Sequence, residues 1–225
     1  MDERDRQDCV ERYEKRLKKF GDAPKALGWG KDRQEIRFSI LCQPILERPD
    51  SSVLDVGCGF ADLYDYLVAH GWHGHYCGID IVPGLLKVAR ERHDHLDLRE
   101  VDITTSGLPL KTYDFAIASG VFNARLKVGN NVAHIEGALR NMYRLVRVAV
   151  CVDFMSTYVD FQRPDAWHTD PGWAFAFATK LTRRVVLRHD YMPFEFALIL
   201  YRDDSISDSN VFKAIENVMQ SGEIP

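Results

Sequence analysis

The sequence predicts one α/β domain built on a mostly parallel sheet with helices on both faces. Apolar runs typical of buried strands alternate with helical patterns through most of the chain. The first run, residues 53–56, leads directly into the glycine loop Gly57-Cys-Gly59. The last two runs are separated only by residues 190–193, which is too short for a parallel crossover, so the final strand must run antiparallel to the one before it.

The N-terminal part of the chain precedes this alternation and is expected to be helical. Residues 5–20 are rich in charge, with apolar side chains near helical spacing, and predict an amphipathic helix. Residues 21–30 hold three Gly and one Pro and predict a linker loop, and residues 36–47 predict a second helix. We expect residues 1–48 to form a helical lid over the rest of the molecule.

Residues 49–205 are expected to form the core of the domain. The predicted strands cover residues 53–56, 75–81, 96–101, 113–119, 148–154, 184–188 and 194–201. The predicted helices between them cover residues 61–70, 83–93, 131–146 and 171–182. The remaining tail, residues 206–225, follows a polar stretch and predicts a short terminal helix.

Composition limits the classes of partner and location. Of 225 residues, 46% are hydrophobic and 28% charged, and the net charge is −4, so no basic surface favours nucleic acid or an anionic membrane. The five cysteines are scattered and form no C-x-x-C pair, which favours a reducing cytoplasm. The first residues are too charged for a signal peptide, and no apolar run is long enough to span a membrane.

Acidic residues end three successive predicted strands. They are Asp55, Asp80 and Asp102, and Ser119 ends the fourth strand. Ligands of open parallel sheets bind beyond the carboxyl ends of the strands, so these side chains mark the expected site. The alternative is that the acids only cap the helices that follow them.

The glycine loop separates two kinds of cofactor. A dinucleotide site uses G-x-G-x-x-G, but the third position here is Asp62, and a carboxylate there would repel a pyrophosphate. A cofactor without phosphates avoids this conflict, and Gly57 and Gly59 let the backbone come close to it. Asp80 follows Gly59 at a spacing that places an acid on ribose hydroxyls.

Four segments in order resemble the motifs of class I S-adenosyl-L-methionine-dependent methyltransferases. They are Ser52-Val-Leu-Asp-Val-Gly-Cys-Gly-Phe-Ala-Asp, Cys77-Gly-Ile-Asp-Ile, Arg99-Glu-Val-Asp-Ile and Tyr113-Asp-Phe-Ala-Ile-Ala-Ser-Gly-Val-Phe-Asn. The resemblance implies a Rossmann-like sheet of order 3-2-1-4-5-7-6. It also implies that Asp80, beside Ile81, binds the ribose and that Asp102 and Ile103 frame the adenine. The flanking segments resemble a bacterial subgroup of small methyltransferases, many without an assigned substrate.

Five further residues are candidates for the site, each with a plain structural alternative. Gln34 and Arg37 share a helix face, where Arg37 could clamp the cofactor carboxylate or simply face solvent. Asn123 could orient the acceptor or serve a turn, and Tyr158 could contact the sulfonium or pack under a loop. His168, in the segment 156–170 that we expect to complete the lid, is the candidate base.

The reaction expected from these features is methyl transfer from S-adenosyl-L-methionine to an oxygen or nitrogen of a small molecule. Three alternatives stay open: a cyclisation or lyase reaction of the cofactor itself, a non-catalytic binding protein, and a nucleotide-linked oxidoreductase. No metal is expected, because the cluster of His70, His73 and His75 falls in a polar loop away from the site. A homodimer is also left open.

Overall fold

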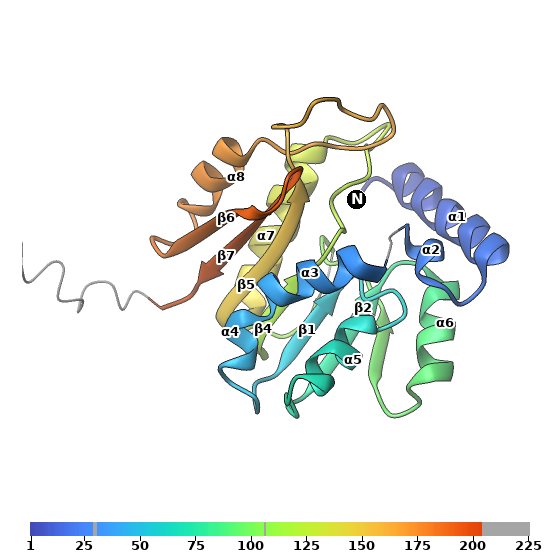
Figure 1. The fold of residues 1–225 in the computed structure, drawn as a ribbon, viewed down its shortest axis with the longest axis horizontal. Coiled ribbons are helices and arrows are strands. Elements are labelled where there is room, and N and C mark those ends of the chain that lie inside the picture. The colour runs from blue at the N-terminus through green and yellow to red at the C-terminus, as the bar shows by residue number, and fades with distance from the viewer. Residues whose placement is uncertain (29–30, 106, 204–225) are drawn as a thin grey trace, which may run out of the picture.

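A seven-stranded sheet forms the centre of the molecule (Figure 1). The computed structural model describes residues 1–28, 31–105 and 107–203, apart from the side chains of residues 31 and 32. The strands are β1 (Val53–Val56), β2 (Tyr76–Asp80), β3 (Asp97–Glu100), β4 (Tyr113–Ala118), β5 (Val146–Met155), β6 (Val185–Met192) and β7 (Glu195–Tyr201). Their order is β3-β2-β1-β4-β5-β7-β6. Strands β1 to β5 pair in parallel, and β7 is antiparallel to both neighbours, so the predicted fold is confirmed.

Eight helices in the described residues surround or cap this sheet. They are α1 (Glu3–Phe20), α2 (Pro24–Leu27), α3 (Lys31–Leu41), α4 (Gln43–Leu46), α5 (Asp62–Ala69), α6 (Pro83–Arg92), α7 (Asn131–Leu145) and α8 (Pro171–Ala178). The helix expected over residues 36–47 is broken between α3 and α4. Pro44 has no N–H to continue the hydrogen-bond pattern of α3, so it starts a new turn instead. Within the expected linker loop, Pro24 starts the one-turn helix α2.

The core is divided by the sheet into two apolar layers. Successive residues of a strand face opposite sides, so Phe115 and Ile117 belong to one layer and Ala116 and Ala118 to the other. Strand β1 is buried on both faces, as its unbroken apolar character predicts. The carboxyl ends of the central strands are therefore held rigidly at one edge of the sheet.

Helix α1 lies across that edge and is held there by several polar contacts, two of which are to backbone N–H groups in the segments that follow the strands (Figure 1). The buried carboxylate of Asp5 accepts hydrogen bonds from the backbone N–H groups of residues 127, 128 and 129, at 2.7, 3.2 and 2.6 Å. Further along the helix, Glu14 accepts a hydrogen bond from the N–H of Gly84, at the start of α6, at 2.9 Å. The predicted lid thus has a helix in the expected place, held by polar contacts and by a small apolar cluster of its own.

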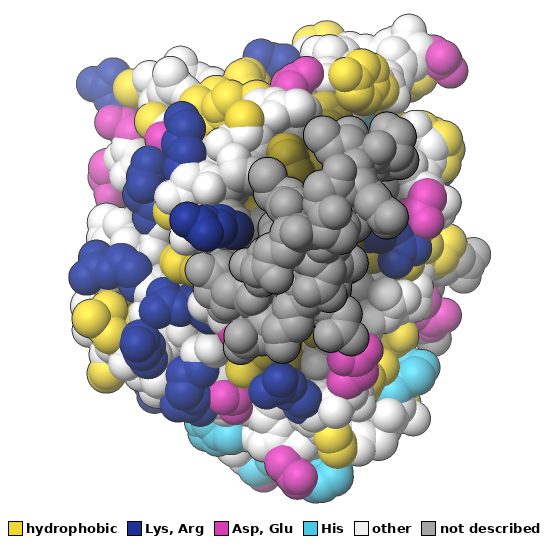
Figure 2. All heavy atoms as spheres, turned by 90° about the vertical axis from the view of Figure 1, so that its left-hand side faces the viewer, with side chains coloured by type: hydrophobic (Ala, Val, Ile, Leu, Met, Phe, Trp, Pro, Cys, Tyr) yellow, Lys and Arg dark blue, Asp and Glu magenta, His cyan; other side chains and the backbone are white. Residues whose placement is uncertain are grey.

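Strand β6 forms one outer edge of the sheet and carries charged residues. Arg188 pairs with Asp190 on this strand at 2.8 Å. Figure 2 looks onto this side of the molecule and shows Lys and Arg side chains gathered along one part of it. Charged edge strands disfavour the addition of another strand.

The predicted terminal helix and the tail 206–225 lie outside the described residues. No helix among the described residues is long and apolar enough to cross a membrane.

Candidate active site

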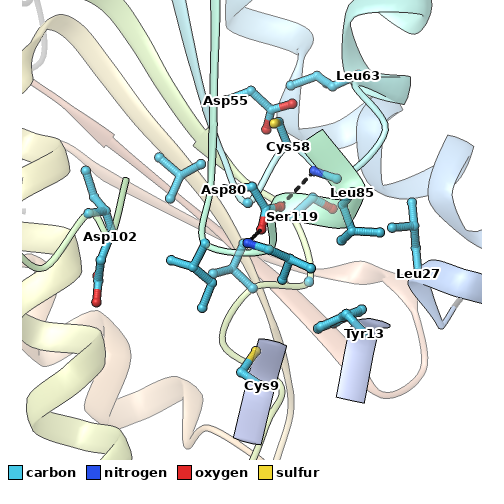
Figure 3. Close-up of a pocket in the computed structure, with 18 of the residues that line it drawn as sticks. Cys9, Tyr13, Leu27, Asp55, Cys58, Leu63, Asp80, Leu85, Asp102 and Ser119 are labelled. Carbon is cyan, nitrogen blue, oxygen red and sulfur yellow. Dashed lines mark hydrogen bonds between the residues drawn. The ribbon is translucent and has the colours of Figure 1, made fainter. Parts of the chain in front are cut away.

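A pocket lies at the carboxyl ends of β1 to β4, beneath α1 (Figure 3). Its floor comes from the loops after these strands, and its walls come from the first three helices. The residues proposed from sequence that line it are Gln34, Arg37, Asp55, Gly57, Gly59, Asp80, Ile81, Asp102, Ile103 and Ser119. Cys9 and Tyr13 of α1 also face it, and no periodicity of α1 alone could have shown which sheet edge that helix covers.

The glycine loop holds its shape through positive φ angles and close approaches. Gly57 has φ +73°, and a Cβ atom there would lie 2.6 Å from Cγ2 of Val121. Gly59 has φ +56°, and its N–H donates to the Asp80 carboxylate at 2.9 Å. Such angles and distances suit glycine alone. The loop is thereby fixed against the end of β2, where the N–H of Val82 also donates to Asp80, at 2.9 Å.

Burial perturbs the acids on the pocket floor. It raises the pKa of Asp55 to about 7, although the Tyr76 hydroxyl donates to this carboxylate at 2.6 Å and lowers the pKa. Burial also raises the pKa of Asp80, against the lowering effect of the backbone N–H groups of Gly59, Ile81 and Val82. Burial raises the pKa of Asp102, but the N–H and hydroxyl donors of Thr104 and the N-terminal ammonium group of Met1, 3.3 Å away, together outweigh burial, so the net direction is down. Perturbed acids gathered in one cleft are characteristic of functional sites.

Arg37 is buried and already carries an acidic partner. Its Nε donates to Glu195 at 2.6 Å, and Nη2 contacts the other oxygen of the same carboxylate. Burial lowers the pKa of Arg37, but the hydrogen bonds to Glu195 and the negative charges of Asp153 and Glu195 together outweigh burial, so the net direction is up. Glu195 starts β7, far from Arg37 in sequence, so helix spacing could not reveal this pair.

Gln34 and Asp62 lie beside each other at the pocket wall. Gln34 donates to the Asp62 carboxylate at 3.1 Å, and Arg92 pairs with the other oxygen at 2.7 Å. Asp62 therefore has a cation beside it, which weakens the repulsion of a pyrophosphate that the sequence alone suggested. Asp62 therefore disfavours a dinucleotide cofactor less strongly than the sequence alone suggested.

The three candidate catalytic residues lie outside the set that lines the pocket. Nδ1 of His168 contacts the Ser156 carbonyl at 2.8 Å, and Nε2 accepts from the N–H of Arg163 at 3.4 Å, so both nitrogens are occupied by backbone. This ring stabilises the loop and has no nitrogen left for a base. The side chain of Tyr158 is 68% exposed. Asn123 accepts from the N–H of Met155 at 3.0 Å, while its buried Nδ2 has no partner among the described residues.

His134 lines the pocket and was missed by the sequence reasoning. It lies in the first turn of α7, with its ring edge against Phe122 at a centroid distance of 5.9 Å. Burial lowers its pKa, so the imidazole is neutral at neutral pH. Its Nδ1 is buried and has no hydrogen-bond partner among the described residues. Among all the residues that the structure describes, no group of three or more His, Cys, Asp or Glu side chains could hold a metal ion.

The fold and this site define an α/β enzyme that binds an adenosine-containing cofactor at the carboxyl edge of its sheet. Residues 54–148 match the family model described as a methyltransferase domain. The Mycobacterium tuberculosis protein Rv1506c, which carries the name of a methyltransferase, is 31% identical over 154 residues, covering 66% of this chain and 92% of its own. The chain therefore belongs to the class I S-adenosyl-L-methionine-dependent methyltransferases.

More distant relatives agree with this membership. The demethylmenaquinone methyltransferase of Listeria welshimeri is 30% identical over 135 residues, which cover 56% of this chain and only half of that protein. Magnesium protoporphyrin IX methyltransferase of Synechocystis, solved with bound S-adenosylmethionine, superimposes with a TM-score of 0.63 at 14% identity, over 88% of this chain and 97% of that one. The structural likeness shows the shared fold.

Proposed function

We propose that this methyltransferase transfers the methyl group of S-adenosylmethionine to an oxygen or nitrogen of a small-molecule acceptor. The observation that carries the proposal is the convergence of the glycine loop and the acids ending β1, β2 and β3 on one pocket. The cofactor supplies an already activated methyl group on a sulfonium. The chain's own work is then to position the reactants and exclude water.

The cofactor-binding residues take separate parts of the pocket in this proposal. Asp80, with Ile81 beside it, holds the ribose, and Asp102 with Ile103 frames the adenine. Four other polar side chains of the lining serve the amino-acid end, namely Gln34, Arg37, Asp55 and Ser119. The donor chemistry fits, because buried carboxylates accept from hydroxyl and ammonium groups and Arg37 attracts a carboxylate.

The residues proposed for the methyl acceptor are supported by fewer observations than those proposed for the cofactor. Asn123 is retained as a group that orients the acceptor, because its buried Nδ2 has no partner among the described residues. Tyr158 is retained as an exposed contact at the edge of the site. His168 is not retained as the base, because both of its ring nitrogens bond to backbone. We also propose a cytoplasmic location, because none of the five cysteines, all of which lie in the described residues, forms a disulfide. The proposed acceptor is not a nucleic acid.

Cofactor binding tests the proposal first. Calorimetry with S-adenosylmethionine, S-adenosylhomocysteine and NADH should show binding of the first two only. Asp80→Ala should weaken both by about a hundredfold, because a ribose acceptor is lost and the glycine loop loses its anchor. Asp97→Asn, on the neighbouring strand β3 and outside the pocket, is the matched control. Unchanged affinity in Asp80→Ala would overturn the assignment of Asp80 to the ribose. Binding of NADH would overturn the assignment of S-adenosylmethionine as the cofactor.

A screen with methyl-labelled cofactor then identifies the acceptor. The roof formed by α1 favours one second candidate, in which the enclosed cofactor reacts with its own amino-acid part. Mass spectrometry of enzyme with cofactor alone separates the two. Methylthioadenosine would be the product of the cyclisation or lyase reaction, whereas methyl transfer yields S-adenosylhomocysteine only when an acceptor is present.

A further inference from the structure

Asp153 is a fully buried acid at the carboxyl end of β5 for which the proposed function has no use. It lies behind the pocket rather than in its lining. The Ser119 hydroxyl donates to one carboxylate oxygen at 2.7 Å, and the N–H of Gly120 donates to the other at 2.6 Å. Ser119 and Gly120 both line the pocket, so Asp153 is separated from the pocket interior by a single layer of residues.

The charge of Asp153 has no ion-pair partner among the described residues. Arg37 lies close enough to lower the pKa of Asp153, but its guanidinium is paired with Glu195 through two nitrogens. One buried cation therefore stands among two buried carboxylates, which leaves an excess of negative charge. The hydroxyl of Tyr191, on β6, belongs to the same group and has no hydrogen-bond partner among the described residues.

A buried charge that its neighbours balance only in part acts over several ångströms, because little water screens it. We propose that Asp153 sets the preference of this pocket for the cationic cofactor over its neutral-sulfur product. S-adenosylmethionine and S-adenosylhomocysteine differ by one methyl group and the positive charge on sulfur. An excess negative charge behind Ser119 stabilises the first ligand more than the second and so assists release of the product. This inference rests on the proposed function.

Asp153 differs in kind from the other acids near the ligand. Asp55 and Asp80 line the pocket, so their replacement removes contacts as well as charge. Asp153→Asn removes the charge alone, because an asparagine oxygen still accepts from Ser119 or Gly120. Its effect should therefore appear in the ratio of the two affinities and not equally in both. A purely structural role would weaken both ligands together.

Calorimetry at pH 8 with S-adenosylmethionine and S-adenosylhomocysteine tests the inference. In Asp153→Asn we expect the ratio of the two affinities to fall by about five- to tenfold, a Coulomb effect across a partly shielded distance. The control is Asp170→Asn, which removes one exposed charge before α8, where Asn also serves as a helix N-cap. An unchanged ratio in Asp153→Asn, with both ligands bound, would overturn the inference. Failure of the unmodified protein to bind either ligand would instead overturn the proposed function.

The pH dependence gives a second measurement that needs no Asp153 variant. Burial raises the pKa of Asp153 to about 6, Arg37 lowers it, and Glu195 raises it. The charge is thus present above pH 6 and lost below it, so the affinity ratio should fall between pH 8 and pH 5. Asp55 and His134 both line the pocket and also change charge as the pH falls, so the measurement is made in Asp55→Asn/His134→Asn protein. A ratio that stays constant through pH 6 in that background would contradict the role of Asp153.

Discussion

The two halves of the pocket are built by different means. On the side of β1 and β2, the shape comes from backbone: positive φ angles at Gly57 and Gly59, and backbone N–H groups that bond to Asp80. On the side of β5 and β7, it comes from side chains far apart in sequence, such as Arg37 with Glu195. Backbone-built features leave local traces in the sequence, whereas long-range pairs leave none. The shape of the first half could therefore be predicted, whereas the pairing of Arg37 with Glu195 in the second half could not.

The largest expected effect falls on the backbone-built half. Gly57→Val should abolish detectable binding of S-adenosylmethionine. The new valine would have to adopt a backbone φ of +73°, and its Cβ would lie 2.6 Å from Cγ2 of Val121. Gly71→Val is the control, since Gly71 has φ +86° but open space around it. Both variants carry similar backbone strain, and calorimetry should find the loss of binding only in the first. Equal binding in both would mean that the loop geometry does not shape the site.

The side-chain-built half should respond in stability as well as in binding. Glu195→Ala removes the carboxylate that bonds to the buried guanidinium of Arg37, and we expect a loss of about 4 kcal/mol in the free energy of unfolding. Urea denaturation measures it. The double variant Arg37→Leu/Glu195→Leu should recover most of this loss, because apolar residues replace the pair.

The same double variant examines the proposed role of Arg37. It should bind S-adenosylmethionine more weakly than the unmodified protein by about tenfold, since a charge-assisted contact to the carboxylate is lost. Methylthioadenosine has no amino-acid part, so its affinity should stay the same. A parallel loss for both ligands would indicate that Arg37 only supports the wall of the pocket.

Asp55, on the side of β1 and β2, gives a prediction that depends on pH. Burial raises its pKa to about 7, so ionisation above pH 7 costs the folded state stability, and this cost fades as the pH falls toward 4. Asp55→Asn should therefore be more stable than the unmodified protein at pH 8, by about 3 kcal/mol, with a difference that shrinks on acidification. In Asp97, a hydrogen bond from Arg99 lowers the pKa, so Asp97→Asn should show no stabilisation at pH 8. Thermal melts across this range measure both.

The outcome of the sequence analysis follows the same division. Every predicted strand overlaps an observed one, because the periodicity of burial is local. The sheet order, which the resemblance to class I methyltransferases implied, is also confirmed. All ten predicted cofactor residues line one pocket, since strand ends converge by topology. The environment of the candidate base could not be predicted, because residue type alone does not show that the backbone of Ser156 and Arg163 bonds to both nitrogens of His168. His134 was missed because its place on a helix face becomes meaningful only once α7 is docked.

The smallest expected effect contrasts these two histidines. His168→Asn should cost about 1 kcal/mol of stability through the lost loop hydrogen bond and leave the affinity for S-adenosylmethionine unchanged. His134→Asn changes a side chain that faces the pocket and should alter that affinity. Once an acceptor has been identified, kcat can be measured. His168→Asn should lower kcat by less than tenfold, whereas loss of a general base lowers kcat by about a hundredfold or more. A fall of that size would restore His168 to catalysis and would require the loop 156–170 to rearrange when the acceptor binds.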